Sequence, residues 1–264
     1  MVNLGQVQYI FSDLDGTLGI DGKGIPERNK QAIKAFVKRG GKFGVCTGRA
    51  PGSAREFLQD IPVNIPCVVN GGCALYDFET GTVTQELFLP EEATDFALGY
   101  MKECPEASLL IVNREGYWRV EDKKEGFLAD KYQTVPLERI AKPWYRIIFA
   151  ASPRYTPRIA KEVEQRKPKG VRMEYTAPDL VEIMNVQAGK YVALKKNCEV
   201  NNISLSQVAF VGDFYNDLEV FEHVEIAACV ANAPKEVKEC CNLVLPECMD
   251  GAVAHLIEKL SKSW

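Results

Sequence analysis

The first predicted strand of this chain ends in a pair of acids, and this arrangement restricts fold and function more than any other feature. An apolar, β-rich run at residues 7–11 is long enough for a buried strand, and Asp13, Asp15 and the turn-forming Gly16 follow it. Ligands of α/β proteins bind beyond the carboxyl ends of the strands, so we expect both acids to face a ligand. Two carboxylates this close repel each other unless a cation or a proton separates them. A magnesium ion, with the two acids acting as nucleophile and proton donor, would resolve this conflict. A turn or helix-capping pair of aspartates is the alternative interpretation.

Three later segments carry polar residues where a predicted strand ends or a helix begins. These are Thr47, Gly48 and Arg49 after the apolar run 42–46, Lys190 within the segment 189–194, and Asp213, Asn216 and Asp217 after the run 208–212. Together with residues 13–18, they match in type and order the four motifs of the haloacid dehalogenase (HAD) superfamily of phosphatases, which this chain therefore resembles. The Thr-Gly-Arg form of the second motif is common in the sugar-phosphatase branch of that superfamily.

The resemblance implies a phosphoryl-transfer site in which these residues have separate roles. Asp13 would be the nucleophile that forms an aspartyl-phosphate, because it comes first in the motif and at the end of the strand. Asp15 would protonate the leaving alkoxide and later deprotonate the attacking water. Thr47 with Gly48 would donate hydrogen bonds to the phosphoryl oxygens, and Lys190 would place a cation beside them.

The resemblance also implies a magnesium ion, since hard oxygen ligands and a substrate phosphate suit this ion. The side chains of Asp13 and Asp213 and the backbone carbonyl of Asp15 are the expected ligands. Asp217 is expected to act as a further ligand, either directly or through a water, and it could also hold Lys190.

Four other residues near these motifs keep two interpretations each. Asn216 could orient the attacking water beside the phosphate or cap a helix. Arg49 could touch the substrate or form a structural salt bridge, and we favour the structural role. Asn70 and Gly71 follow a predicted strand at 67–69, and we favour turn residues near the site over direct substrate contacts.

The alternation of strands and helices predicts an α/β fold that is interrupted by a different unit. A Rossmann-like parallel sheet with helices on both faces is expected for residues 1–88 and 186–264. The segment 67–72 reads as a third strand and tight turn of this core, and 77–82 as a hairpin turn. Residues 89–185 lack an acid-tipped strand and predict an α+β unit with a small mixed or antiparallel sheet. An insert at this place resembles the cap domain of the Cof-type (class IIB) subfamily.

Composition limits the possible partners and the compartment. The formal net charge of −4 argues against nucleic acid or a membrane surface as the main partner. No apolar run approaches the roughly 20 residues that span a bilayer, and the N-terminus lacks the features of a signal peptide. Nine cysteines without metal-ligand spacing and only two histidines argue against a zinc site and favour free thiols in a reducing cytoplasm. The expected partner is a small phosphorylated metabolite, and the sequence does not predict the oligomeric state.

The resulting hypothesis is a magnesium-dependent phosphatase acting on a small phosphorylated metabolite, with a sugar phosphate favoured. A phosphomutase and a non-catalytic sugar-phosphate sensor on the same scaffold are the alternatives. Loss of Asp13, Asp15 or Lys190 would favour the sensor, and all three are present. Four side chains of the predicted cap could contact the leaving group, although for each one a core or solvated strand position is favoured: Arg114, Trp118, Arg119 and Arg146.

The chain departs from the pattern of the family in two places beside the predicted site. Tyr191 replaces the glycine that usually follows the lysine, and Ala231 replaces the glycine that usually precedes Asn232. Neither change removes a catalytic group, so we expect them to affect substrate fit and hinge behaviour.

Overall fold

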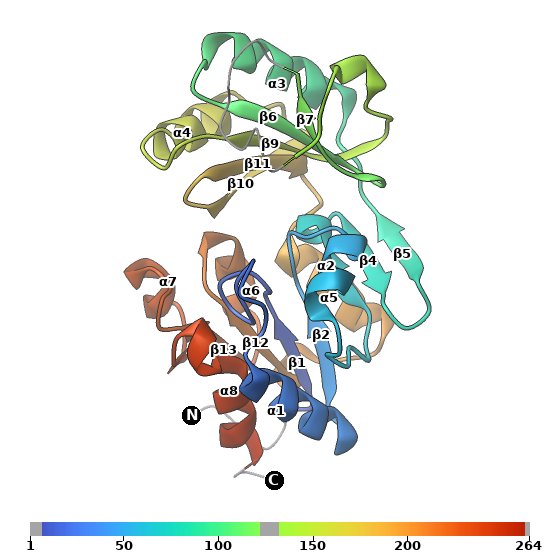
Figure 1. The fold of residues 1–264 in the computed structure, drawn as a ribbon, viewed down its shortest axis with the longest axis vertical. Coiled ribbons are helices and arrows are strands. Elements are labelled where there is room, and N and C mark those ends of the chain that lie inside the picture. Colours follow the sequence, from blue (N-terminus) through green and yellow to red (C-terminus); the bar gives the residue numbers. More distant parts are fainter. Residues whose placement is uncertain (1–6, 122–131, 262–264) are drawn as a thin grey trace. The chain divides into compact units, whose positions relative to one another are not determined.

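The computed structural model describes residues 7–121 and 132–261 of the chain. Packing divides the chain into two compact units. The core unit comprises residues 1–85 and 190–264, and the inserted unit comprises residues 86–189 (Figure 1). Among the described helices, none combines the length and the apolar character that crossing a lipid bilayer requires.

The core unit is built on a five-stranded, wholly parallel sheet with the order β14-β13-β12-β1-β2. Its strands are β1 (Tyr9–Ser12), β2 (Lys42–Val45), β12 (Val208–Gly212), β13 (Ile226–Val230) and β14 (Leu243–Leu245). The chain runs outward from β1 to β2 and later continues from β12 in the opposite direction. The strand order therefore reverses between β1 and β12, and such a reversal opens a crevice at the carboxyl ends of the strands. The predicted α/β fold is confirmed.

The helices and helical turns of the core unit follow the strands in sequence. The helices are α1 (Glu27–Lys38), α2 (Pro51–Leu58), α5 (Lys190–Val200), α6 (Leu218–Phe221), α7 (Lys235–Glu239) and α8 (Ala252–Ser261), and the 3-10 turns are Asn70–Gly72, Leu205–Gln207, Tyr215–Asp217 and Cys248–Asp250. Helices α1 and α8 pack against each other, whereas α5 packs against α6 and against the strand that follows α2.

The unbroken apolar runs of the sequence reflect burial of the central strands on both faces. Every residue of β12 is buried, as expected for an inner strand of a parallel sheet covered on both sides. Phe11, Phe43 and Phe210 are fully buried and form part of this core. Gly44 in β2 leaves the space that Phe11 occupies, because a Cβ at Gly44 would lie 2.7 Å from the Phe11 ring.

The third strand does not extend the parallel sheet by a regular ladder. Strand β3 (Cys67–Val69) pairs antiparallel with β4 (Ala74–Asp77), and β5 (Thr82–Glu86) completes a separate three-stranded sheet. The parallel contact to the main sheet is an isolated bridge between Cys46 and Val68. The turn after β3 is too short for a crossover, so the next strand returns antiparallel beside it. The hairpin turn predicted at 77–82 is confirmed, with the Gly81 N–H donating to the Asp77 carbonyl at 2.8 Å.

The inserted unit contains a six-stranded, mostly antiparallel sheet with the order β10-β11-β9-β6-β7-β8. Its strands are β6 (Ser108–Asn113), β7 (Gly116–Val120), β8 (Thr134–Val135), β9 (Trp144–Ala150), β10 (Val171–Ala177) and β11 (Leu180–Asn185), and its helices are α3 (Glu91–Glu103), α4 (Thr156–Arg166) and the 3-10 turn Leu137–Arg139. Strand β8, which pairs parallel with β7, has only two residues and leaves no alternating pattern in the sequence.

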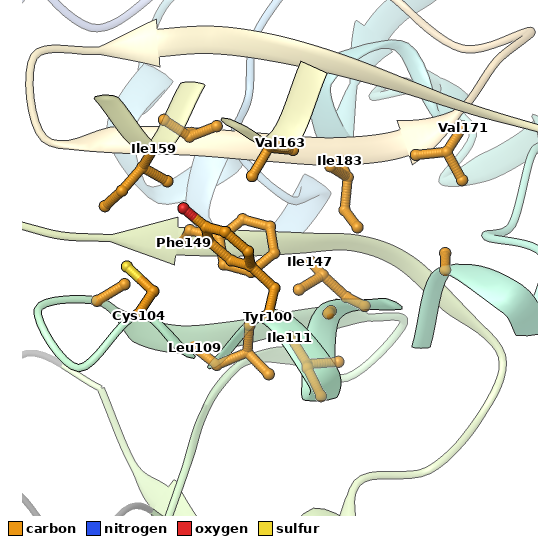
Figure 2. Close-up of a cluster of buried hydrophobic side chains, with 14 of the residues drawn as sticks. Tyr100, Cys104, Leu109, Ile111, Ile147, Phe149, Ile159, Val163, Val171 and Ile183 are labelled. Carbon is orange, nitrogen blue, oxygen red and sulfur yellow. The ribbon is translucent and has the colours of Figure 1, made fainter. Parts of the chain in front are cut away.

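The inserted unit has a hydrophobic core of its own. Alternate residues of the central strands, such as Ile147 and Phe149 in β9, meet apolar residues of α3 and α4 (Figure 2). The Tyr100 ring of α3 packs edge-on against Phe149 with centroids 5.4 Å apart. Ile159 and Val163, one turn apart on α4, close the cluster. This unit therefore does not depend on the core unit for an apolar interior.

Candidate active site

The predicted site residues of the core unit gather at the carboxyl ends of three neighbouring strands. Asp13 directly follows β1, Asp213 directly follows β12, and Thr47 comes two residues after β2. The backbone N–H of Asp13 donates to the carbonyl of Val211 at 2.8 Å and so continues the pairing of β1 with β12 beyond the last residue of β1. These side chains therefore lie where the strand order reverses, which is the position expected for a ligand.

Three carboxylates form a compact acidic cluster at this place. One oxygen each of Asp13, Asp213 and Asp217 lies within 4.8 Å of the others. Burial raises the pKa of Asp13 well above its usual value, and the charges of neighbouring acids raise it further, while Lys190 opposes the rise. Burial and the charge of Asp217 raise the pKa of Asp213 to about 6, against the opposing effects of Lys190 and Thr17.

This donor set fits a divalent cation. Carboxylate oxygens are the ligands that magnesium prefers, and a cation among them would relieve the repulsion that, together with burial, raises the pKa values of Asp13 and Asp213. Asp13 and Asp213 are the side chains that would hold it. The backbone next to Asp15 also lies close to Asp213, since a Cβ on Gly16 would be 2.4 Å from Oδ2 of Asp213. Gly16 has a φ of +82°, which a glycine adopts without strain.

Lys190 lies at the first position of α5 and is buried with its ammonium among the acids. Its Nζ is 2.7 Å from Oδ1 of Asp217 and 3.1 Å from Oδ1 of Asp13. Burial lowers the pKa of Lys190, but the charges of Asp13 and Asp217 outweigh this effect and raise it above its usual value. The side chain therefore stays a cation next to the proposed nucleophile.

Asp217 acts as the support of this cation and of the loop after β12. Its Oδ2 accepts hydrogen bonds from the backbone N–H groups of Asp213 at 3.0 Å and Phe214 at 3.3 Å, while Oδ1 faces Lys190. Gly212 makes the approach possible, since a Cβ there would lie 2.4 Å from Oδ2 of Asp217. Two roles were considered for Asp217, a metal ligand and a partner of Lys190, and the structure contains the contact with Lys190.

Two further residues, which are not among the predicted site residues, support Asp213 and the first loop. The Thr17 hydroxyl donates to Oδ1 of Asp213 at 2.9 Å, and the Asn232 side-chain amide donates to the carbonyl of Gly16 at 3.2 Å. Thr17 belongs to the same motif as Asp13, and Asn232 belongs to a loop that resembles one of the family, so both signals were present in the sequence. Their partners lie about 200 residues away along the chain, which a local pattern does not reveal.

The loop that carries Thr47 is braced by the turn after β3. The Thr47 hydroxyl accepts a hydrogen bond from the Arg49 N–H at 3.0 Å, and this bond does not use its own hydrogen. Beyond Gly48, the Arg49 carbonyl accepts from the N–H of Asn70 at 2.9 Å, and the Thr47 carbonyl accepts from the N–H of Gly71 at 3.0 Å. Asn70 and Gly71 have φ values of +51° and +66°, so this turn has a left-handed backbone. The turn role expected for these two residues is thus present beside the site.

Two side-chain amide oxygens beside the site are buried without a hydrogen-bond partner among the described residues. They are Oδ1 of Asn70 and Oδ1 of Asn216. A buried carbonyl oxygen without a partner is costly, and such atoms are commonly satisfied by a water or a ligand. Both residues therefore stay candidates for contact with a bound molecule.

Asp15 differs from Asp13 in its surroundings. Its side chain is 47% exposed, and both carboxylate oxygens accept hydrogen bonds from Arg49, from Nε at 2.8 Å and from Nη2 at 2.6 Å. Arg49 also contacts Asp21 at 3.1 Å. The salt bridge favoured for Arg49 is present, and one of its partners is the predicted proton donor.

The four side chains for which a core or solvated strand position was favoured over contact with the leaving group each have partners within the inserted unit. Arg114 forms two hydrogen bonds with Glu86, the Trp118 indole N–H donates to Asn113 at 2.9 Å, Arg119 donates to Thr134 at 3.3 Å, and Arg146 pairs with Glu182 and donates to the Tyr117 hydroxyl at 3.0 Å. Arg119 and Arg146 are buried, whereas Arg114 is exposed.

Comparison with known proteins places the chain in a family. The profile of the haloacid dehalogenase-like hydrolases matches residues 10–257. The chain is 26% identical to the 5-amino-6-(5-phospho-D-ribitylamino)uracil phosphatase YwtE of Bacillus subtilis over 96% of this chain and 98% of that protein. It is 23% identical to the pyridoxal phosphate phosphatase YbhA of Escherichia coli over 95% and 97% of the two chains.

A solved structure shares the fold over nearly the whole length. The HAD subclass IIB sugar phosphatase BT4131 superposes with a TM-score of 0.83, at 17% identity, over 97% of this chain and 99% of that one. The family profile covers both segments of the core unit and the inserted unit between them. The chain belongs to the haloacid dehalogenase-like hydrolase family.

Proposed function

We propose that this protein is a magnesium-dependent phosphatase that hydrolyses a small phosphorylated metabolite, with a sugar phosphate as the favoured substrate. The observation that carries the proposal is the buried contact of Lys190 with Asp13 at the carboxyl ends of the strands of the parallel sheet. A cation beside a buried carboxylate, with further acids within reach, suits a dianionic phosphoryl group that a carboxylate oxygen attacks.

Asp13 is the proposed nucleophile. A phosphate monoester resists attack by another anion, so its charge must be neutralised and the attacking oxygen must be held in line. Lys190 holds Asp13 and supplies one positive charge, and the Thr47 hydroxyl supplies a donor to a phosphoryl oxygen. A bound magnesium would supply further neutralisation of charge between the acids and the phosphoryl oxygens. The product of the first step is an aspartyl-phosphate on Asp13, which water hydrolyses in the second step.

Asp15 is the proposed proton donor to the leaving oxygen and the base for the attacking water. General acid–base help of this kind contributes typically about 10²–10⁴-fold. Arg49 takes one acceptor position on each oxygen of Asp15, and a carboxylate oxygen offers two such positions. A second position on Asp15 therefore stays available for the proton that is transferred.

The relatives support the phosphatase and differ in their substrates. YwtE and YbhA are named for a phosphorylated ribitylaminouracil and for pyridoxal phosphate, and BT4131 is named a sugar phosphatase. Each of these names specifies a small phosphorylated metabolite or a sugar phosphate as the substrate. We propose that the inserted unit acts as the cap that selects among such metabolites, since the catalytic groups all belong to the core unit. A cytoplasmic location is proposed with it, because an odd number of cysteines without paired spacing suits a reducing compartment.

A phosphomutase and a non-catalytic sensor use the same scaffold. A sensor would only have to bind the phosphate, so it would not need a nucleophile such as Asp13 held by Lys190 near the proton donor Asp15. The geometry therefore favours an enzyme. A mutase must keep water from the aspartyl-phosphate, whereas a phosphatase lets water release inorganic phosphate from it. A measurement of released phosphate therefore distinguishes the two.

A screen of phosphorylated metabolites tests the proposal. Purified protein is incubated with sugar phosphates, pyridoxal phosphate and an aryl phosphate, each with magnesium and with chelator, and released phosphate is measured. We expect phosphate release that requires magnesium and is fastest with one class of sugar phosphate. Full activity in chelator would exclude the metal site, and the absence of phosphate release from every substrate would contradict the phosphatase.

A further inference from the structure

The guanidinium of Arg49 forms a bidentate contact with the carboxylate of Asp15, in which two nitrogens donate to the two oxygens. This bidentate contact is called the fork. Nε donates to Oδ2 at 2.8 Å and Nη2 donates to Oδ1 at 2.6 Å, so both oxygens are engaged by one planar group. Such a fork sets the direction of a carboxylate as well as its distance, which a lysine cannot do. Asp15 itself lies in a loop, and its side chain is about half exposed. The fork is therefore the contact that orients its carboxylate.

Arg49 is in turn fixed by side chains on both sides of it. Its Nη1 donates to the Ser53 hydroxyl at 3.2 Å, and its guanidinium lies 4.2 Å from the centre of the Phe57 ring. Ser53 and Phe57 are one turn apart on α2, so they present the same face of that helix. Asp21, in the loop before α1, accepts from Nη2 at 3.1 Å. The side chain of Arg49 is only 17% exposed as a result.

The two acids of the first motif thus have separate cationic partners. Asp13 is held by Lys190 from α5, and Asp15 is held by Arg49 beside α2. This arrangement fits two acids with different tasks, because each carboxylate keeps its own direction although only one residue separates them. An error of about 1 Å in the position of a catalytic group can cost about 10²-fold in rate.

We propose that Arg49 is the positioning residue of Asp15, and that Asp21, Ser53 and the Phe57 ring hold Arg49 in place for this task. The inference rests on the proposed phosphatase function, in which Asp15 transfers the proton to the leaving group. A purely structural role explains the geometry less well, since an ion pair with a half-exposed acid adds little to stability. Removal of Arg49 should therefore affect proton donation far more than folding.

The test uses a series of aryl phosphates whose leaving groups range from acidic nitrophenols to weakly acidic phenols. The slope of log kcat/KM against the acidity of the leaving group measures how much the enzyme helps departure by protonation. Wild type should show a shallow slope and D15N a steep one, because good leaving groups need little protonation. R49A should show a steep slope, with the smallest loss of kcat/KM on the nitrophenyl ester and a loss of about 10²-fold on the poorest leaving group.

The double variant D15N/R49A provides the decisive comparison. If Arg49 acts only through Asp15, its removal has no further effect once Asp15 is an amide, and the two changes are not additive. R49K keeps the charge but cannot form the fork, so we expect its slope to approach that of R49A. D21N should steepen the slope less, because Arg49 keeps its other contacts.

The variant R28A is the control. Arg28 also pairs with both oxygens of one carboxylate away from the site, that of Glu258 between α1 and α8, although a single nitrogen, Nη2, makes both contacts at 2.9 Å. R28A should keep the wild-type slope, and thermal unfolding confirms that each variant is folded. Should R49A instead raise KM equally for all esters, and do so again in the D15N background, Arg49 would contact the substrate and the inference would be wrong. An unchanged slope in D21N would remove Asp21 from the arrangement.

Failure of this inference can be told apart from failure of the proposed function. A wild type that releases no phosphate from any ester in magnesium would contradict the phosphatase itself. A wild type that is active while R49A and R49K keep its shallow slope would overturn only the role of Arg49.

Discussion

The ammonium of Lys190 lies 2.7 Å from a carboxylate oxygen of Asp217, and both side chains are almost completely buried. The remaining oxygen of Asp217 accepts two backbone N–H groups of the loop after β12. The pair therefore joins the start of α5 to the loop that carries Asp213. It sets the position of the cation beside Asp13 and also ties together two segments of the core unit.

The first prediction concerns the stability of this pair. K190M leaves two buried aspartates without their cation, and breaking a buried pair in this way costs about 3–5 kcal/mol. Chemical denaturation should therefore show a strongly destabilised K190M protein. The double variant K190M/D217N removes one of the two stranded charges, so it should recover part of the loss while staying inactive. Equal stability of K190M and wild type would show that the cation is not needed among these acids.

The second prediction concerns Asp13. D13N should lose turnover on every substrate by several orders of magnitude, because an amide cannot form the aspartyl-phosphate. Its fold should be intact, and without magnesium it should be at least as stable as wild type, since burial and the charges of three neighbouring acids disfavour the Asp13 carboxylate more than Lys190 favours it. Phosphate release and thermal unfolding measure the two effects. Wild-type rates in D13N would remove the nucleophile assignment.

The third prediction concerns pH and magnesium. Burial raises the pKa of Asp213 from 3.8 to about 6, so the folded protein binds a proton at this group more tightly than the unfolded chain does. In the metal-free protein, the contribution of Asp213 to stability should fall as the pH rises through this range. Magnesium binds the ionised acids, so the rise in Tm on adding magnesium should be larger at about pH 7.5 than at about pH 5.

The variant D213N is the control for this measurement. Without the second carboxylate, magnesium should raise the Tm much less at either pH. A magnesium effect that is independent of pH in the wild type would contradict a site built on the acids with raised pKa values.

Calcium should not support phosphatase activity in place of magnesium, because it prefers more ligands and longer bonds than magnesium.

The fourth prediction concerns the inserted unit. Because this unit has its own apolar core, deleting residues 89–184 and bridging the ends should leave a folded core unit. The capless protein should hydrolyse an aryl phosphate weakly and lose discrimination among sugar phosphates. Circular dichroism checks the fold before the rates are compared. A folded core that kept the ranking of sugar phosphates would mean that core loops, such as those at Arg49 and Asn70, select the substrate.

The sequence was most informative where one local pattern decides the structure. The apolar runs before Asp13 and Asp213 predicted buried strands, and both acids lie at the ends of such strands. The α/β fold and the family resemblance are confirmed. The boundaries of the two predicted domains and the roles of the site residues stay predictions.

The remaining features depend on tertiary structure. Strand β3 has the apolar composition of a core strand, but its pairing was decided by the short turn at Asn70, which returns the chain antiparallel. The fork between Arg49 and Asp15 joins two loops 34 residues apart, and the contact of Thr17 with Asp213 spans 196 residues. Patterns along a chain report which face of an element is apolar, but they do not report which loops meet.

The central claim is that Asp13 carries the phosphoryl group during the reaction. D15N offers the most direct test, because a nitrophenyl phosphate should still transfer its phosphoryl group while the attack of water on the intermediate is slowed. The protein is mixed with this ester and magnesium, quenched in acid, digested and examined by mass spectrometry. The account predicts one phosphoryl group on Asp13 in D15N and none in D13N/D15N. Continued release of nitrophenol with no phosphoryl group on Asp13, or with the group on another residue, would contradict it.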